Sequence, residues 1–271
     1  MNMKYVLSIL LAMCLWSCKD NIDFEYHSTD PMYVVEGRVT NTDAAVSVSM
    51  SQDMESTSDS VPVNDARVII TGDDGSMQML QSVGYGKYVA EEGFCGKKGV
   101  TYTLQVNVGG NTFQSSSTMQ DTTTINALNF TWEKVMNEEI LGLHVNFDDI
   151  KNDSNYYCLR VYRNDTIYMW NVMKDMGYEN QCIDRTLTMI TKSKLEKNKD
   201  EDHDKMVYEG DRIRLQLLVI DKRTYDYLTS LRMSTNNRSN PYLNFGGLCM
   251  GYFSAYGMTE KEIIYNAAHF K

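Results

Sequence analysis

The densest group of residues that could bind a metal ion is DEDHDK at residues 200–205, where four acids surround His203. Carboxylate oxygens bind Ca²⁺, and imidazole nitrogens bind Zn²⁺. A calcium-binding loop turns at a glycine and carries its ligands at fixed alternate positions, but this run contains no glycine. We therefore interpret it, together with the charged TKSKLEKNKD (191–200) before it, as a solvated loop between strands.

A second group of acids, Asp148, Asp149 and Asp153, lies in FDDIKNDSN at residues 147–155. This segment lacks the D-x-[DN]-x-[DN]-G order of an EF-hand loop. Asp and Asn commonly stabilise turns between strands, so we interpret it as a loop as well. The sequence predicts no metal site and no cofactor.

Motifs typical of catalysis are missing from the sequence. It has no G-x-S-x-G elbow, no H-E-x-x-H pair, no P-loop and no G-x-G-x-x-G turn. Two carboxylates can hydrolyse a glycoside, but among 36 acids some pair is close by chance. Only His144 falls in a predicted strand; the other histidines are His27, His203 and His269. We predict that the protein is not an enzyme.

Aromatic side chains offer a different chemistry. Six of them fall within 23 residues: Tyr156, Tyr157, Tyr162, Tyr168, Trp170 and Tyr178. Exposed aromatic rings bind sugars and peptides by stacking and through hydroxyl hydrogen bonds. A glycan or peptide ligand is therefore one hypothesis. Strand alternation must bury about half of these rings. The alternative is therefore that some rings pack in the core and the others lie at the rim of a hairpin.

Four cysteines lie beyond residue 18: Cys95, Cys158, Cys182 and Cys249. None has C-x-x-C spacing, and none has a histidine nearby at metal-ligand spacing. Four cysteines permit three pairings, and an exported protein could oxidise them. Buried thiols packed as small apolar groups are the alternative, and the sequence leaves both states open.

Cys18 follows an apolar run, at a position where folding seldom requires a cysteine. Lys4 supplies a positive charge, and residues 5–16 are almost wholly apolar. That run is too short to cross a bilayer, which takes about 20 residues, but it suits a secretory signal peptide. LWSC (15–18) matches a bacterial lipobox, with a tryptophan where a smaller residue is usual. We predict a lipoprotein signal peptide at residues 1–17 and lipidation of Cys18; an ordinary signal peptide cut elsewhere is the alternative.

Acyl chains such as palmitate on Cys18 would hold the protein at a membrane, because each buried methylene contributes about 0.8 kcal/mol. The residues that follow include the acids Asp20, Asp23 and Glu25. Such a stretch resembles the signal that sends some Gram-negative lipoproteins to the cell surface, and it also suits a solvated tether over residues 18–30. We predict a lipid-anchored outer-membrane protein that faces the cell surface.

Charge narrows the range of partners. The 271 residues carry a formal charge of −10, and loss of Lys4 would leave 25 basic and 36 acidic residues, or −11. An acidic protein is a poor candidate for binding nucleic acid or anionic lipid headgroups.

Few prolines and many Tyr, Thr, Ser and Val favour β-sheet.

Residues 31–119 predict an immunoglobulin-like β-sandwich. VTYTLQVNV (100–108) alternates apolar and polar residues, two glycines turn the chain, and NTFQSSSTM (111–119) returns, which is a hairpin pattern. Further strands are predicted at 33–40, 45–50, 66–71, 76–82 and 86–91. About seven short strands in about 90 residues match the size of an immunoglobulin-like domain.

Residues 125–271 predict a second β-rich domain, joined through the polar linker QDTTTINAL (120–128) with the boundary near 120–126. Helical spacing of Tyr227, Leu228 and Leu231 predicts one short helix within 223–233. Strands are predicted at 128–132, 141–147, 156–163, 166–172, 185–190, 211–221 and 247–257. The predicted fold class is mainly β, with two sandwich-like domains and a single short helix in the second.

A glycine inside the last predicted strand indicates a close neighbour. In NPYLNFGGLCMGYF (240–253), Pro241 begins a loop or an edge, and Gly251 lies within the strand. Glycine in a strand interior costs stability. We therefore expect the same domain or the N-terminal sandwich to pack against Gly251.

Four blocks of the sequence resemble, in the same order, the exported lipoproteins grouped as domain of unknown function 4249. They are YVVEGRVTN (33–41), VPVNDARVIITGDDG (61–75), GKYVAEEGFCGKKGVTYTLQVNVGG (86–110) and NPYLNFGGLCMGYFSAYG (240–257). The resemblance implies an N-terminal sandwich like the regulatory domains attached to carboxypeptidases and TonB-dependent receptors, and a β-rich C-terminal domain. It also implies a frequent gene neighbourhood with a TonB-dependent receptor, and no catalytic residues.

Two hypotheses for function follow. The first is a lipid-anchored binding protein that serves a TonB-dependent uptake system, by capturing a nutrient or docking on the receptor. The second is a structural or adhesive surface module without a small-molecule ligand. A concave pocket between the two domains, lined by Trp170 and the tyrosines, would favour the first, and a convex surface with an open edge strand would favour the second.

Overall fold

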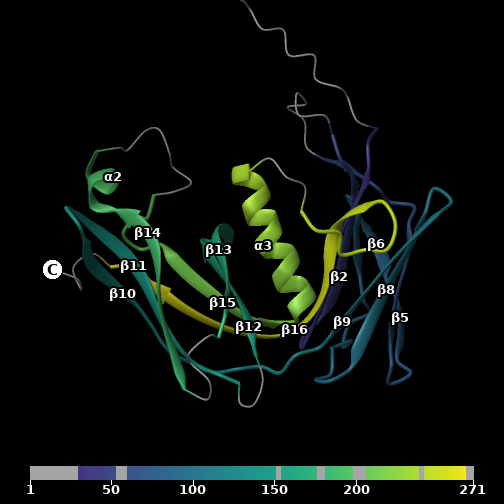
Figure 1. Ribbon diagram of the computed structural model, residues 1–271, viewed down its shortest axis with the longest axis horizontal. Helices are drawn as coiled ribbons and strands as arrows, with labels where there is room; N and C mark the ends of the chain where they lie inside the picture. Colours follow the sequence, from purple (N-terminus) through teal and green to yellow (C-terminus); the bar gives the residue numbers. More distant parts are fainter. Residues whose placement is uncertain are drawn as a thin grey trace, which may run out of the picture. The chain divides into compact units, whose positions relative to one another are not determined.

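Residues 30–52, 60–150, 154–175, 181–197, 206–237 and 241–266 are described by the computed structural model. Cys18, the predicted signal peptide at residues 1–17, Tyr178 and the acidic run at 200–205 lie outside them, as does Asp153. The described part of the chain is mainly β, as the sequence predicts, and its strands form three sheets (Figure 1).

The largest sheet has nine strands in the order β13-β12-β15-β16-β1-β2-β7-β6, with β3 paired to β2. Both halves of the sequence therefore contribute to one sheet. Its strands are β1 (Tyr33–Thr40), β2 (Ala44–Met50), β3 (Val61–Pro62), β6 (Gln81–Gly84), β7 (Lys87–Val89), β12 (Tyr156–Arg163), β13 (Thr166–Lys174), β15 (Arg212–Ile220) and β16 (Cys249–Ile264).

Two smaller sheets each pack on part of the large sheet and enclose a hydrophobic core. One has the order β5-β4-β8-β9 and shares a core with β1, β2 and part of β16. The other has the order β10-β11-β14 and shares a core with β12 and β15. Their strands are β4 (Arg67–Gly72), β5 (Met77–Met79), β8 (Thr101–Val108), β9 (Asn111–Thr118), β10 (Ile125–Val135), β11 (Glu138–Asp148) and β14 (Cys182–Thr191).

Strand β16, yellow in Figure 1, takes part in both sandwiches. Its first half, Cys249 to Tyr256, pairs in parallel with β1, and the second half pairs antiparallel with β15. Phe253 thus belongs to the core of the N-terminal sandwich, although it lies beyond residue 125. The division of the chain near residues 120–126 stays a prediction.

Gly251 has the close neighbour that the sequence predicts. A Cβ atom at this position would lie 2.0 Å from the carbonyl oxygen of Val35, and the φ angle of Gly251 is +97°. The neighbour is the backbone of β1 in the N-terminal sandwich. Only glycine fits both the space and the backbone conformation.

Helix α3 (Lys222–Asn237) covers the face of the large sheet opposite the two cores. Its Leu228 packs against Cys158 and Leu218, which alternate with core residues along β12 and β15. This helix confirms the one predicted within 223–233. No helix among the described residues is long and apolar enough to span a membrane.

A second helix, α2 (Lys192–Lys197), lies in a segment for which the sequence predicts a loop. Apolar periodicity could not reveal it, because Leu195 is its one apolar residue. That side chain packs against the C-terminal core. The described part of this half thus holds two helices rather than one.

Candidate functional site

Asp148 and Asp149 stabilise local structure. Asp149 Oδ1 accepts a hydrogen bond of 2.6 Å from the hydroxyl of Tyr157, and both residues are buried. Burial and this carboxylate raise the pKa of Tyr157. Asp148 accepts a hydrogen bond from Asn126 Nδ2 at 2.7 Å. Within the described ranges no three His, Cys, Asp or Glu side chains are grouped to hold a metal ion.

Strand alternation, together with a register shift at Tyr168 in the β12–β13 pairing, sends the predicted aromatic cluster to opposite faces of the large sheet. Tyr157 is buried in the C-terminal core, and Tyr168 packs against the same core and donates a hydrogen bond of 2.9 Å to the carbonyl of Met189. Tyr162 and Trp170 instead point to the face that carries α3. Tyr162 and Trp170 therefore lie outside the C-terminal core, on the face where α3 packs.

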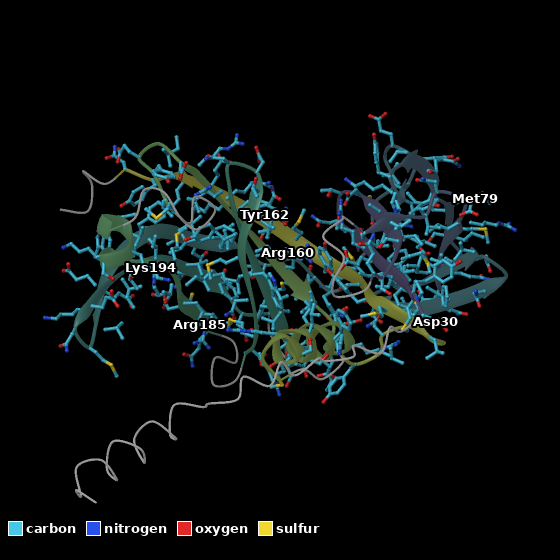
Figure 2. All side chains as sticks on the ribbon, turned by 90° about the horizontal axis from the view of Figure 1, so that it is seen from above. Asp30, Met79, Arg160, Tyr162, Arg185 and Lys194 are labelled. Carbon is cyan, nitrogen blue, oxygen red and sulfur yellow. The ribbon has the colours of Figure 1, made fainter. Side chains whose placement is uncertain are left out.

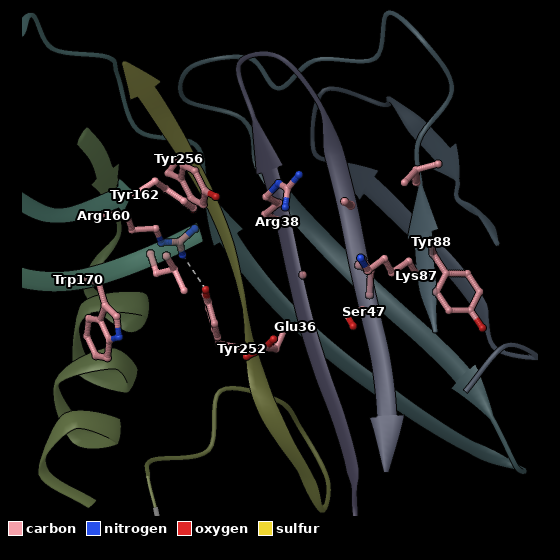
Figure 3. A pocket seen from close by; sticks show the side chains of 15 residues that line it. Glu36, Arg38, Ser47, Lys87, Tyr88, Arg160, Tyr162, Trp170, Tyr252 and Tyr256 are labelled. Carbon is pink, nitrogen blue, oxygen red and sulfur yellow. Dashed lines mark hydrogen bonds between the residues drawn. The ribbon is translucent and has the colours of Figure 1, made fainter. Parts of the chain in front are cut away.

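A groove of about 640 Å³ lies on that face (Figure 3). Its lining comes from β1, β2, β7, β12, β13 and β16, so both halves of the chain build it. The volume falls within the range of about 300–1,000 Å³ that is usual for ligand sites. The residues that could recognise a ligand are Arg38, Lys87, Arg160, Trp170 and Tyr252, whereas Tyr256 also lines the groove but is buried.

Arg160 lies on β12 beside Tyr162 (Figure 2), at the aromatic end of the groove (Figure 3). Its Nη2 donates a hydrogen bond of 2.9 Å to the hydroxyl of Tyr252. The guanidinium carbon is 5.9 Å from the centroid of the Tyr256 ring, and Trp170 is the partner of Arg160 in the β12–β13 register. Among the described residues, no carboxylate forms an ion pair with Arg160.

The two phenols beside Arg160 are neutral at physiological pH. Burial is the largest influence on both hydroxyls, and it raises the pKa of Tyr252 and of Tyr256 above the ordinary value for tyrosine. Neither phenol therefore supplies a negative charge to the guanidinium. Arg160 keeps its full charge, because guanidinium does not lose its proton in proteins.

A tight hairpin holds Arg160 and Trp170 in register. Asn164 and Asp165 connect β12 to β13 with φ angles of 48° and 68°, which fits a two-residue type I′ turn. The Asp165 carboxylate pairs with Arg212 and Arg214 on the neighbouring strand β15. Asparagine and aspartate tolerate positive φ well, so the sequence favours this turn.

Arg38 and Lys87 extend the positive charge along the groove. Arg38 Nη2 forms an ion pair of 2.7 Å with Asp43. Burial raises the pKa of Asp43, but hydrogen bonds from Arg38 and Thr40 outweigh it and lower that pKa overall. Lys87 lies on β7 beside Ser47 of β2. Glu36 is the one acid that lines the groove in the part of the chain that the structure describes.

Sequence reasoning found Tyr162 and Trp170 but missed the basic side of the site. Arg38, Tyr252 and Tyr256 come from β1 and β16, which are far apart in sequence. One local feature of the sequence could have revealed Arg160. Arg160 interrupts the apolar strand between Leu159 and Val161, which are both buried, and a charged residue at such a position needs a reason.

The model of the family "Domain of unknown function (DUF4249)" matches residues 19–262. The chain belongs to this family. No curated protein matches it. Among solved structures, a two-domain fibronectin type III segment from chicken tenascin is similar at 9% identity, covering 88% of this chain and 100% of that one, with a TM-score of 0.23.

Three of the four DUF4249 blocks supply strands of the groove. Block 33–41 contains β1 with Glu36 and Arg38, block 86–110 contains Lys87 on β7, and block 240–257 contains Tyr252 and Tyr256. Arg160 and Trp170 lie outside these blocks, on the β12–β13 hairpin. The groove thus joins strands that resemble the family to a hairpin that the four blocks do not include.

Proposed function

We propose that this DUF4249 protein is a lipid-anchored binding protein of the outer membrane that faces the cell surface and serves a TonB-dependent nutrient-uptake system. The observation that carries the binding role is Arg160. A guanidinium beside neutral aromatic residues, without a carboxylate partner among the described residues, is arranged to receive a ligand.

The lining of the groove suits binding better than catalysis. Among the described residues, it contains Glu36 as its one carboxylate, and no histidine or cysteine. General acid–base chemistry needs a donor and an acceptor of protons placed on either side of the reacting bond. We therefore expect the protein to hold its ligand without turning it over.

The anchor rests on the sequence, since Cys18 lies outside the described residues. Metabolic labelling with a palmitate analogue, followed by mass spectrometry of the N-terminal peptide, tests it. We expect an acylated Cys18 in the wild type, and an uncleaved or soluble protein for Cys18→Ala. A wild-type peptide without an acyl group would remove the anchor from the proposal.

The receptor is tested by purification from the native outer membrane. The protein, tagged at its C-terminus, is solubilised in mild detergent and its partners are identified by mass spectrometry, with Cys18→Ala as the matched control. We expect a TonB-dependent receptor with the wild type and none with the control. Recovery of the acylated protein without any receptor would refute the uptake role, while leaving a role in ligand binding open.

An adhesive module is the second candidate, and the edges of the N-terminal sandwich favour it. Strands β5 and β6 lie at the edges of their sheets, and Met77, Val83 and Tyr85 nearby are 71%, 58% and 86% exposed. Exposed edges with apolar residues commonly contact other proteins. A protein that binds cells or other proteins through this edge, and that has no ligand in the groove, would establish the second function.

A further inference from the structure

We propose that the ligand of the groove is an acidic saccharide, whose hexuronate carboxylate binds Arg160 and whose sugar ring lies against Trp170. This inference rests on the proposed binding function and names the class of ligand. Three features of the groove carry it: its charge, its aromatic rings and its paired backbone.

The charge of the groove is opposite to that of the protein. The whole chain carries −10, yet the described lining of the groove holds three cations, Arg38, Lys87 and Arg160, and one acid, Glu36. Arg38 is paired with Asp43, whereas Arg160 and Lys87 have no ion pair among the residues described. Two cations thus remain for a negatively charged ligand.

A carboxylate fits the guanidinium of Arg160. Guanidinium presents five N–H donors in a planar fork that matches the two oxygens of a carboxylate. One of these donors is directed to Tyr252. The remaining donors are enough for a two-point contact with the ligand.

The aromatic rings fit a sugar ring. Trp170 lies across from Arg160 in the β12–β13 register, and Tyr256 contacts the same guanidinium. Aromatic side chains combine a flat apolar face with a polar edge. A pyranose has the complementary form, with axial C–H groups on one face and hydroxyls around its rim.

The backbone pairing of most strands that line the groove argues against a peptide ligand. Peptides that bind sheets usually add a strand at an open edge and use main-chain hydrogen bonds. Five of the six strands that line the groove, β12, β16, β1, β2 and β7, have a neighbour on both sides, whereas β13 lies at the edge of the sheet. The main-chain groups of those five strands are already used, so a ligand lying over them is recognised through side chains, which here are rings and cations.

Isothermal titration calorimetry of the full chain tests the proposal with defined probes. The probes are oligomers of galacturonate, of mannuronate and guluronate, and of hyaluronan. The matched control is methyl-esterified oligogalacturonate, which keeps the ring but loses the charge. We expect at least one uronate probe to bind, binding to weaken as salt screens the charges, and the esterified control to bind at least about tenfold more weakly.

Variants locate the site. Arg160→Gln should weaken binding by about tenfold or more, because hydrogen bonds between charged groups are lost, and Arg160→Lys should weaken it less. Trp170→Ala should also weaken it. Arg67→Gln, at an exposed position on β4 outside the groove, should bind as the wild type does. Thermal melts confirm that each variant is folded.

Several outcomes would overturn the inference. Equal binding of the esterified control, or of Arg160→Gln in folded form, would show that no carboxylate binds Arg160. Binding of a sulfated neutral oligosaccharide or an acidic peptide in place of every uronate would assign the groove to another ligand class, with the binding function intact. If no probe binds while the receptor is recovered, the saccharide is wrong and the uptake role stands.

Discussion

The side chain of Asn41 takes the place of a strand partner for the backbone of Met258. Asn41 Oδ1 accepts a hydrogen bond of 2.9 Å from the Met258 N–H, and Asn41 Nδ2 donates one of 3.2 Å to the Met258 carbonyl. Asn41 directly follows β1, and Met258 lies where β16 leaves β1 and begins to pair with β15. One amide thus continues the ladder across the point at which the strand changes partners.

Asn41→Ala removes both hydrogen bonds at this point. We expect it to lower the free energy of unfolding by about 1–2 kcal/mol, since each neutral hydrogen bond contributes about 0.5–1.5 kcal/mol. Asn41→Asp keeps an acceptor for the Met258 N–H and loses the donor, so its effect should be smaller. Urea unfolding followed by circular dichroism measures both. Wild-type stability for Asn41→Ala would mean that the amide only fills space.

This junction shows what the sequence could not reveal. Alternating apolar residues predicted β1, and helical spacing predicted α3, because both patterns are local in the sequence. The pairing of Tyr33 with Cys249 joins residues that are far apart in sequence, and one strand pattern does not name its partner. The length of β16 was underestimated for a different reason. Its second half is polar and half-exposed, so it lacks the apolar pattern of a strand.

The groove was predictable only in part. The aromatic cluster drew attention to Trp170, because it is dense in sequence. The association of Arg160 with Tyr252 depends on the order of strands in the large sheet. The segment 76–82 gives a smaller example, because it divides into β5 and β6 at the buried Leu80, where the chain passes from one sheet to another.

Gly251→Val tests the close approach of β16 to β1. The added side chain would collide with the Val35 carbonyl, and valine would be strained at a φ of +97°. We expect a loss of stability of at least about 2 kcal/mol from overpacking and backbone strain together. Gly246→Ala is the control, because its nearest neighbour would be 3.8 Å away. A Gly251→Val protein that melts like wild type but no longer binds its receptor would instead identify β16 as an interface.

Stability should fall at alkaline pH because of buried tyrosines. Burial raises the pKa of Tyr168 and of Tyr227 from 10.0 to about 12, with Glu36 adding to the effect at Tyr227. Both hydroxyls ionise first in the unfolded chain, so this stabilisation is complete below pH 10 and is lost as the pH rises towards 12. Denaturant midpoints measured across this range should fall, and less steeply for Tyr168→Phe. A flat profile would refute the prediction.

Thiol reactivity should separate the four described cysteines into two classes. Cys95 and Cys182 are exposed, whereas Cys158 and Cys249 are buried, and burial raises the pKa of both buried thiols. Because the thiolate is the reactive form, we expect iodoacetamide to label only the exposed pair in the native protein. Peptide mapping by mass spectrometry measures this. A disulfide among the four in the exported protein would contradict the free-thiol state.

The hydrogen bond between Cys182 and Asp148 allows a separate test of thiol reactivity. Its Sγ donates a hydrogen bond of 3.3 Å to Asp148 Oδ1, and this bond raises the pKa of the thiol. Asp148→Asn removes the negative charge and should lower that pKa. Alkylation of Cys182 at neutral pH should therefore become faster, with Cys95 in the same sample as the unchanged reference. An unaltered rate at Cys182 would mean that the carboxylate does not control it.

The N-terminal sandwich should depend on β16 for its folding. Residues 31–119 were predicted from sequence to form a domain, yet the core that they build also contains Phe245, Cys249, Phe253 and Ala255. Without β16, strand β1 would lose its parallel partner and the core would lose a large part of one wall. A chain of residues 31–119 should therefore lack a cooperative thermal transition in circular dichroism, because an opened core loses both burial and close packing.

A peptide of residues 241–258, added to the same chain, should restore the transition in proportion to its concentration, as expected for a ligand that binds only the folded state. The same peptide with Gly251→Val is the matched control and should fail, since its side chain would meet the Val35 backbone. If residues 31–119 alone melt cooperatively at the temperature of the full protein, the N-terminal sandwich is an independent domain and β16 is only an addition to its edge.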